Sequence, residues 1–133
     1  MKQQIIKIIL IAVLPFLFYS CQNTYSACIK FHEGKFKLVG KELGTTFITR
    51  KNNIQTEINH DAGFHIRLSV NWVSDCEYTL KLIEVINNNA KLPFDTAIVL
   101  KVEMTELKKN SYIQRSLSDK LPKVYTSEIF RIE

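Results

Sequence analysis

Short catalytic motifs are missing from this chain of 133 residues. It contains no Gly-x-Ser-x-Gly turn for a serine nucleophile, no glycine loop for a phosphate and no His-Glu-x-x-His zinc helix. We therefore predict that the protein is not an enzyme, and the sequence implies no cofactor.

Metal-ligand spacings are equally scarce. Cys28 and Cys76 are 48 positions apart, far from any Cys-x-x-Cys or zinc-knuckle pattern. His60, Asp61 and His65 fall around one turn, but surface histidines explain them equally well. No metal site is predicted.

No long basic run is present, although the pI is about 9.1. Beyond residue 20 the chain has 16 basic and 13 acidic residues, a net charge of +3, and no basic run there is longer than Lys108-Lys109. No aromatic-basic cluster accompanies these charges, so we do not expect a nucleic-acid partner.

The longest apolar run is also too short to span a membrane. Ile8–Tyr19 is about a dozen residues, against the roughly 20 that a transmembrane helix needs, and it contains Pro15. It follows Lys2 and Lys7, the order of a charged and then an apolar region in a secretory signal peptide. Residues 1–20 are predicted to be an export signal.

A cysteine follows this run directly. The stretch Leu17–Cys21 resembles the bacterial lipobox, in the form with serine before the cysteine that is common among Bacteroidetes lipoproteins. The resemblance implies that Cys21 is acylated and anchors the mature chain in the membrane. The alternative is ordinary cleavage near Ser26–Ala27, which would release a free domain.

The predicted mature chain has a short polar tether, residues 21–27, followed by one domain, residues 28–133. The residues after Cys21 have no acidic cluster resembling the surface-export signal of Bacteroidetes. We therefore expect an outer-membrane lipoprotein that faces the periplasm.

With Cys21 assigned to lipid, two cysteines remain in an oxidising compartment. A disulfide between Cys28 and Cys76 is the favoured interpretation, and two separate buried thiols are the alternative.

Alternation with period two dominates the domain and predicts strands. In residues 64–72 the apolar side chains share one face and the polar ones the other, as an antiparallel sheet over one core requires. The predicted strands are residues 34–39, 45–50, 53–59, 64–73, 76–86, 96–108, 111–116 and 124–132. We predict an all-β fold: one antiparallel meander of about seven or eight strands, curled into a sandwich or an open barrel.

Two local patterns, Cys28-x-x-Phe31-x-x-Gly34-x-Phe36 and Trp72-x-x-Asp75-Cys76-x-Tyr78-x-Leu80, support a resemblance. Together they resemble a family of short, exported flavobacterial envelope lipoproteins. The resemblance implies a Cys28–Cys76 disulfide and no known activity. The Gly-x-aromatic opening and the meander are also similar to lipocalins at the level of the fold.

Two roles follow from these expectations. The first is a membrane-anchored envelope lipoprotein with a non-catalytic structural or interaction function. The alternative is a lipocalin-like carrier, in which Phe64, Trp72, Tyr78 and Phe94 line a cavity for a small apolar ligand. A hollow interior would favour the carrier, and a filled core with an exposed patch would favour the interaction role.

Overall fold

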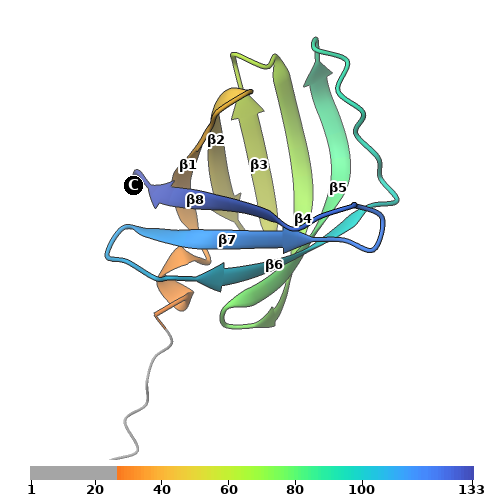
Figure 1. Cartoon of the computed structure of the whole chain (residues 1–133). Coiled ribbons are helices and arrows are strands. Elements are labelled where there is room, and N and C mark those ends of the chain that lie inside the picture. Colours follow the sequence, from red (N-terminus) through yellow and green to blue (C-terminus); the bar gives the residue numbers. More distant parts are fainter. Residues whose placement is uncertain (1–26) are drawn as a thin grey trace, which may run out of the picture.

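The computed structural model describes residues 27–133, and within them the chain forms eight strands (Figure 1). The strands are β1 (Gly34–Gly40), β2 (Gly44–Lys51), β3 (Ile54–Asn59), β4 (Phe64–Ser74), β5 (Glu77–Asn88), β6 (Val99–Thr105), β7 (Ser111–Leu117) and β8 (Tyr125–Arg131). A one-turn 3-10 helix, η1 (Ile29–Phe31), precedes them. The predicted all-β meander is confirmed, whereas the predicted signal segment, residues 1–20, lies outside the described residues.

The strands close into a barrel. Each strand pairs antiparallel with the next, and β1 also pairs with β8, from Phe36 opposite Arg131 to Leu38 opposite Ile129. Closure pairs the two strands that would otherwise expose their backbone groups at a sheet edge. The sequence left a sandwich and an open barrel as alternatives; the chain forms a barrel, and this barrel is closed rather than open.

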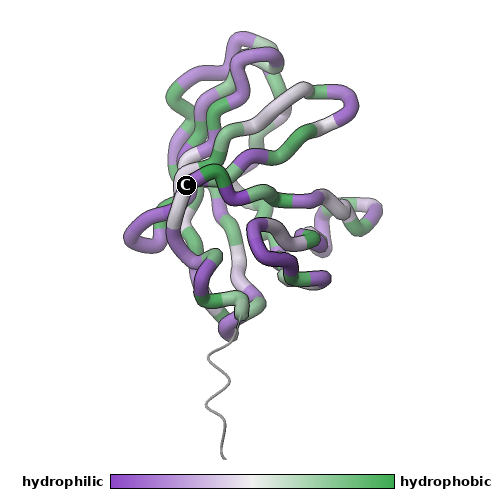
Figure 2. The backbone as a smooth tube through the Cα atoms, turned by 90° about the vertical axis from the view of Figure 1, so that its left-hand side faces the viewer, coloured by the Kyte–Doolittle hydropathy of each residue, from purple (hydrophilic) through white to green (hydrophobic). Residues whose placement is uncertain are grey.

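Hydrophobic and hydrophilic residues intermix along the strands (Figure 2), and on β4 buried and more exposed residues alternate as the sequence predicts. On β4 the inward residues Phe64, Ile66, Leu68 and Val70 are buried, and the residues between them are more exposed. Because a strand turns successive side chains to opposite faces, this pattern fixes which face of β4 lines the barrel interior.

The β2–β3 turn shows how local residue type sets a connection. Asn52 and Asn53 both have positive φ angles, 51° and 59°. A two-residue hairpin turn that matches strand twist needs this backbone, and asparagine tolerates it. The break between the predicted strands 45–50 and 53–59 falls at this turn.

The strand predicted over residues 96–108 is shorter in the structure, since β6 spans Val99–Thr105. Before it, the Asp95 carboxylate accepts a hydrogen bond of 2.7 Å from the Ala97 backbone N–H and holds a turn. After it, Glu106 has a φ of 47°, which ends the extended conformation.

The barrel has two different ends. At the closed end η1 lies beneath the barrel, next to the β4–β5 turn (Figure 1). At the open end are the connections at residues 41–43, 60–63, 89–98 and 118–124.

Candidate functional site

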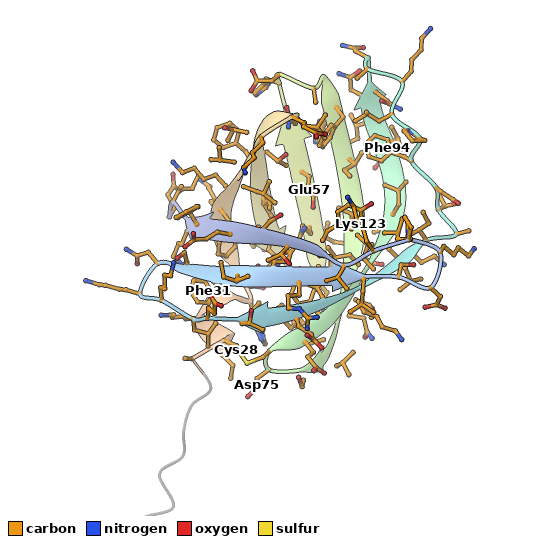
Figure 3. The ribbon with its side chains drawn as sticks, in the orientation of Figure 1. Cys28, Phe31, Glu57, Asp75, Phe94 and Lys123 are labelled. Atoms are coloured by element: carbon orange, nitrogen blue, oxygen red, sulfur yellow. A yellow bond between two sulfur atoms is a disulfide. The ribbon has the colours of Figure 1, made fainter. Side chains whose placement is uncertain are left out.

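A disulfide fastens η1 to the closed end. Cys28, just before η1, is bonded to Cys76 in the β4–β5 turn, with Cα atoms 5.2 Å apart (Figure 3). The predicted bridge is confirmed, and the alternative of two separate thiols is wrong. In the chain-entropy model a bridge that closes a loop of this length stabilises the fold by about 4 kcal/mol.

Arg131, at the end of β8, also holds the segment around η1. It donates hydrogen bonds to the backbone carbonyls of Lys30 and Glu33, the latter at 2.9 Å. Its guanidinium carbon lies 5.2 Å from the centroid of the Phe36 ring. Gly34 leaves room for this approach, because a Cβ atom there would lie 2.7 Å from an Arg131 nitrogen. The Gly-x-Phe opening is therefore explained by packing against Arg131.

Behind η1 lies a buried arginine with its partners, which we term the Arg50 cluster: Arg50, Gln55, Tyr78, Tyr112 and the Phe31 carbonyl. Arg50 is only 1% exposed. It donates to Gln55 Oε1 at 2.9 Å, to the Phe31 carbonyl at 2.6 Å and to both tyrosine hydroxyls at 3.1 Å. A buried guanidinium needs such partners in place of water.

The cluster holds a cation next to two phenol oxygens. Burial alone lowers the pKa of Arg50, but the oxygens of Tyr78 and Tyr112 and the charge of Glu57 outweigh it, so its pKa is raised. Burial raises the pKa of Tyr78 well above its ordinary value, although the Arg50 charge opposes this. At neutral pH we therefore assign the cluster a structural role.

Between the Arg50 cluster and the open end lies a cavity of about 330 Å³. Its walls are mostly aliphatic and come from several strands and from the connections after β5 and β7. The lining residues are Leu38, Thr46, Ile48, Glu57, Ile66, Leu68, Leu80, Leu82, Pro93, Phe94, Asp95, Ile98, Leu100, Gln114 and Leu121. Asp95 is exposed, so the cavity reaches the surface at the connection after β5.

Glu57 is the acidic residue on the strand wall of this cavity (Figure 3). Its Oε1 accepts a hydrogen bond of 2.6 Å from the side-chain amide of Gln55. Burial raises the pKa of Glu57, and the Gln55 hydrogen bond and the Arg50 charge counteract only part of this rise. The carboxyl is half-buried because it borders the cavity.

The four aromatic residues predicted to line a ligand cavity lie in two separate pairs, Phe64 with Phe94 and Trp72 with Tyr78. Phe94, on the connection after β5, lines the cavity. Phe64 packs edge-on against it with ring centroids 5.5 Å apart and is not among the lining residues. Trp72 lies at the closed end, stacked on His32 at 3.5 Å, and Tyr78 belongs to the Arg50 cluster.

The histidines near the β3–β4 turn do not form a metal site with Asp61. Within residues 27–133, no group of three or more His, Cys, Asp or Glu side chains is arranged to hold a metal ion. Asp61 instead accepts a hydrogen bond of 3.3 Å from the Thr45 backbone N–H. It packs against Gly44, where a Cβ atom would lie 2.2 Å from its carboxylate.

Sequence reasoning missed Arg50 and Glu57. Both are polar residues on inward faces, where the hydrophobic pattern predicts apolar ones. The signal that could have found them is the hairpin at Asn52-Asn53, which places Arg50 opposite Gln55. Alternation from Gln55 then places Glu57 on the same inward face.

The residues 1–26, including the predicted lipid attachment site Cys21, lie outside the described residues. Among residues 27–133, no helix has the length and apolar character needed to cross a membrane.

In comparisons with known proteins, no family model, no curated protein and no solved structure matches the chain. The resemblance to flavobacterial lipoproteins therefore stays a prediction.

Proposed function

We propose that this protein binds a small, largely apolar molecule inside its barrel and has no catalytic role of its own. The cavity of about 330 Å³ is the observation that supports this proposal. Ligand sites in proteins typically measure about 300–1,000 Å³ and have mostly apolar walls with a few polar groups. A barrel whose only task were to present its surface would gain stability by filling this space.

The cavity suits one short ligand. Its volume is at the lower end of the range for small-molecule sites. Leucine and isoleucine dominate the wall, so an aliphatic chain or a small ring would be held by burial alone, at about 25 cal/mol for each Å² removed from water. We therefore expect a ligand of roughly octyl size rather than a long acyl chain.

We further propose that the barrel is held at the membrane by a lipid on Cys21, as a lipoprotein on the periplasmic side of the outer membrane. The tether is short, and Cys28 is bonded into the closed end. The closed end would then be the end nearer the point of attachment. Intact-mass spectrometry of membrane-extracted protein should show acyl chains on Cys21, and Cys21→Ser should move the protein to the soluble fraction. Unchanged partitioning of that variant would reject the anchor.

A second role, interaction through a strand edge, is favoured by β5. The pairing of β5 with β6 ends at Lys81 opposite Val99, so within residues 27–133 the part of β5 beyond Leu82 pairs only with β4. Ile83, Val85 and Ile86 on this part are 41–50% exposed. An apolar strand edge favours pairing with another strand, here that of a second copy. Sedimentation over a range of concentrations tests this role, because Val85→Lys should abolish any dimer that forms.

The binding function is tested on the unmodified protein. Native mass spectrometry of protein purified from its host should show extra mass that disappears on denaturation. A neutral apolar fluorophore, N-phenylnaphthylamine, should bind the emptied barrel with one-to-one stoichiometry and enhanced emission. Absence of both signals would reject the proposal.

A further inference from the structure

The charges on the cavity wall have one sign. Among the residues that line it, the polar ones are Thr46, Glu57, Asp95 and Gln114, and none is lysine, arginine or histidine. Lys123, two positions after Leu121, is exposed, and its Nζ lies over the Tyr125 ring, 5.4 Å from the centroid. Inside a medium of low polarity, two carboxylates without a basic wall residue favour a cationic guest over an anionic one.

Most of the other polar groups near the cavity are already engaged. Gln114 accepts a hydrogen bond from Tyr78 at 3.1 Å and donates one to Ser116 at 3.0 Å. Thr46 accepts a hydrogen bond of 3.0 Å from Asn59. Because these hydrogen bonds already occupy both side chains, neither is the primary anchor for a ligand.

Glu57 differs from them. Its Oε1 is held by Gln55, and among residues 27–133 no hydrogen bond reaches Oε2. A carboxylate oxygen accepts hydrogen bonds and cannot donate them while ionised. Within residues 27–133 no buried side-chain oxygen lacks a hydrogen-bond partner, so Oε2 is accessible from the cavity and is a free acceptor on its apolar wall.

The Arg50 cluster positions this acceptor. Arg50 Nε donates to Gln55 Oε1, which turns the amide so that its NH₂ group faces Glu57. Arg50 itself does not line the cavity, and hydrogen bonds to the protein engage its Nε, Nη1 and Nη2 atoms. A ligand therefore meets the Glu57 carboxylate and not the guanidinium.

Resting on the proposed function, we infer that the ligand is an aliphatic amine, whose ammonium group donates a hydrogen bond to Glu57 Oε2 while its apolar body lies against the aliphatic wall. A charge-assisted hydrogen bond is about twice as strong as a neutral one, so an ammonium is preferred over a hydroxyl. A carboxylate ligand would place like charges together and be disfavoured. Burial raises the pKa of Glu57, and a cationic guest would lower it again because it favours the ionised carboxylate.

Three ligands with the same apolar chain test this inference by isothermal titration calorimetry: octylamine, octanol and octanoate. At neutral pH the amine should bind about tenfold more tightly than the alcohol, a step that corresponds to one charge-assisted hydrogen bond. Octanoate should bind most weakly.

Three variants locate the source of the preference. Glu57→Gln keeps the shape of the side chain and should remove the amine preference while octanol binding is retained. Glu84→Gln removes a carboxylate from the outer face, where Glu84 pairs with Arg67, and should leave all three affinities unchanged. Asp95→Asn tests the mouth of the cavity and should change the preference less than Glu57→Gln.

The outcomes separate the two proposals. If octanol and N-phenylnaphthylamine bind but the amine has no advantage over octanoate on the unmodified protein, the amine inference is wrong and the binding function stands. If Asp95→Asn alone removes the preference, Glu57 is not the anchor. If none of these compounds binds, both proposals are wrong. If Glu57→Gln fails to fold, the comparison of the three octyl ligands on the unmodified protein still tests the amine inference.

Discussion

The two ends of the barrel are built from the same strands but treat inward polar side chains differently. At the closed end, Arg50 is fully surrounded, and each of its nitrogens donates to a protein acceptor. In the cavity, Glu57 has one engaged oxygen and one that faces open space. Within residues 27–133 every buried side-chain nitrogen and oxygen atom has a hydrogen-bond partner, so Glu57 Oε2, which has none, is accessible from the cavity and can accept a hydrogen bond from a ligand. We assign the closed end to stability and propose that the cavity serves binding.

The largest expected effect is loss of the disulfide. Cys28→Ala combined with Cys76→Ala should lower the free energy of unfolding by about 4 kcal/mol, because the unfolded chain regains the freedom of a long loop. For a domain of this size each kcal/mol corresponds to about 4–8 °C in Tm, so calorimetry should show a fall of about 16 °C or more.

A reductant provides the control for this prediction. It should lower the Tm of the parent protein and leave that of the double variant unchanged. Binding of N-phenylnaphthylamine to the fraction that remains folded should be retained. Lost binding in folded protein would contradict the separation of the two ends.

Arg50→Met should have the next largest effect. The substitution keeps the length of the side chain but leaves the Phe31 carbonyl, Gln55 and the two phenols of the cluster without their donor. Unpaired buried groups cost about 1–3 kcal/mol each, and partial rearrangement reduces the sum, so we expect a loss of about 3 kcal/mol by urea unfolding. Arg115→Met is the matched control. Arg115 pairs with Glu103 at 2.6 Å on the exposed surface, and its loss should cost about 1 kcal/mol or less. Equal losses in the two variants would mean that the Arg50 cluster contributes no more than a surface pair.

A smaller effect is expected from the pH dependence of Glu57. Its pKa is raised by burial in the folded protein, so the folded chain binds this proton more tightly than the unfolded chain does. Stability contributed by this group therefore declines as pH rises from the ordinary carboxyl pKa through the folded pKa. Glu57→Gln removes this decline, so the variant should gain stability relative to the parent as pH rises through that window. The gain should be smaller than the losses expected from removing the disulfide or from Arg50→Met.

Urea unfolding at a series of pH values measures this gain, and Glu84→Gln should show no comparable trend. A Glu57→Gln variant that loses stability relative to the parent as pH rises would contradict the assignment of a burial-raised pKa.

Much of the fold follows from local sequence signals. Alternation over residues 64–72 predicts the inward face of β4, and Asn52-Asn53 predicts the hairpin that joins β2 to β3. These signals work because neighbouring residues set both strand faces and turns. The disulfide was predicted from the cysteine count and the resemblance together.

Closure of the barrel was not predictable in this way. Closure depends on the short pairing of β1 with β8. The register of this pairing is set by the curvature that accumulates over all the strands between them. No residue in either strand carries that information alone.

The cavity was hardest to predict from sequence. On β3 the usual pattern is inverted, since Gln55 and Asn59 are buried while Ile54 and Ile58 are partly exposed. Hydrophobic periodicity assigns the wrong face to such a strand. Phe94 is placed by an irregular connection rather than a strand, so alternation gives no information about its direction.

The central claim, a barrel hollow enough to bind a ligand, is tested most directly by two adjacent tryptophan substitutions on β5. Leu82 lines the cavity and Ile83, 50% exposed, points outward. Leu82→Trp should fill the cavity and weaken N-phenylnaphthylamine binding by at least about tenfold, equivalent to about 1.4 kcal/mol. It should leave the free energy of unfolding unchanged, whereas overpacking of a filled core lowers it by about 1–3 kcal/mol. Ile83→Trp should leave binding unchanged. Equal binding by both variants, or a Leu82→Trp protein that is destabilised like an overpacked core, would contradict the account.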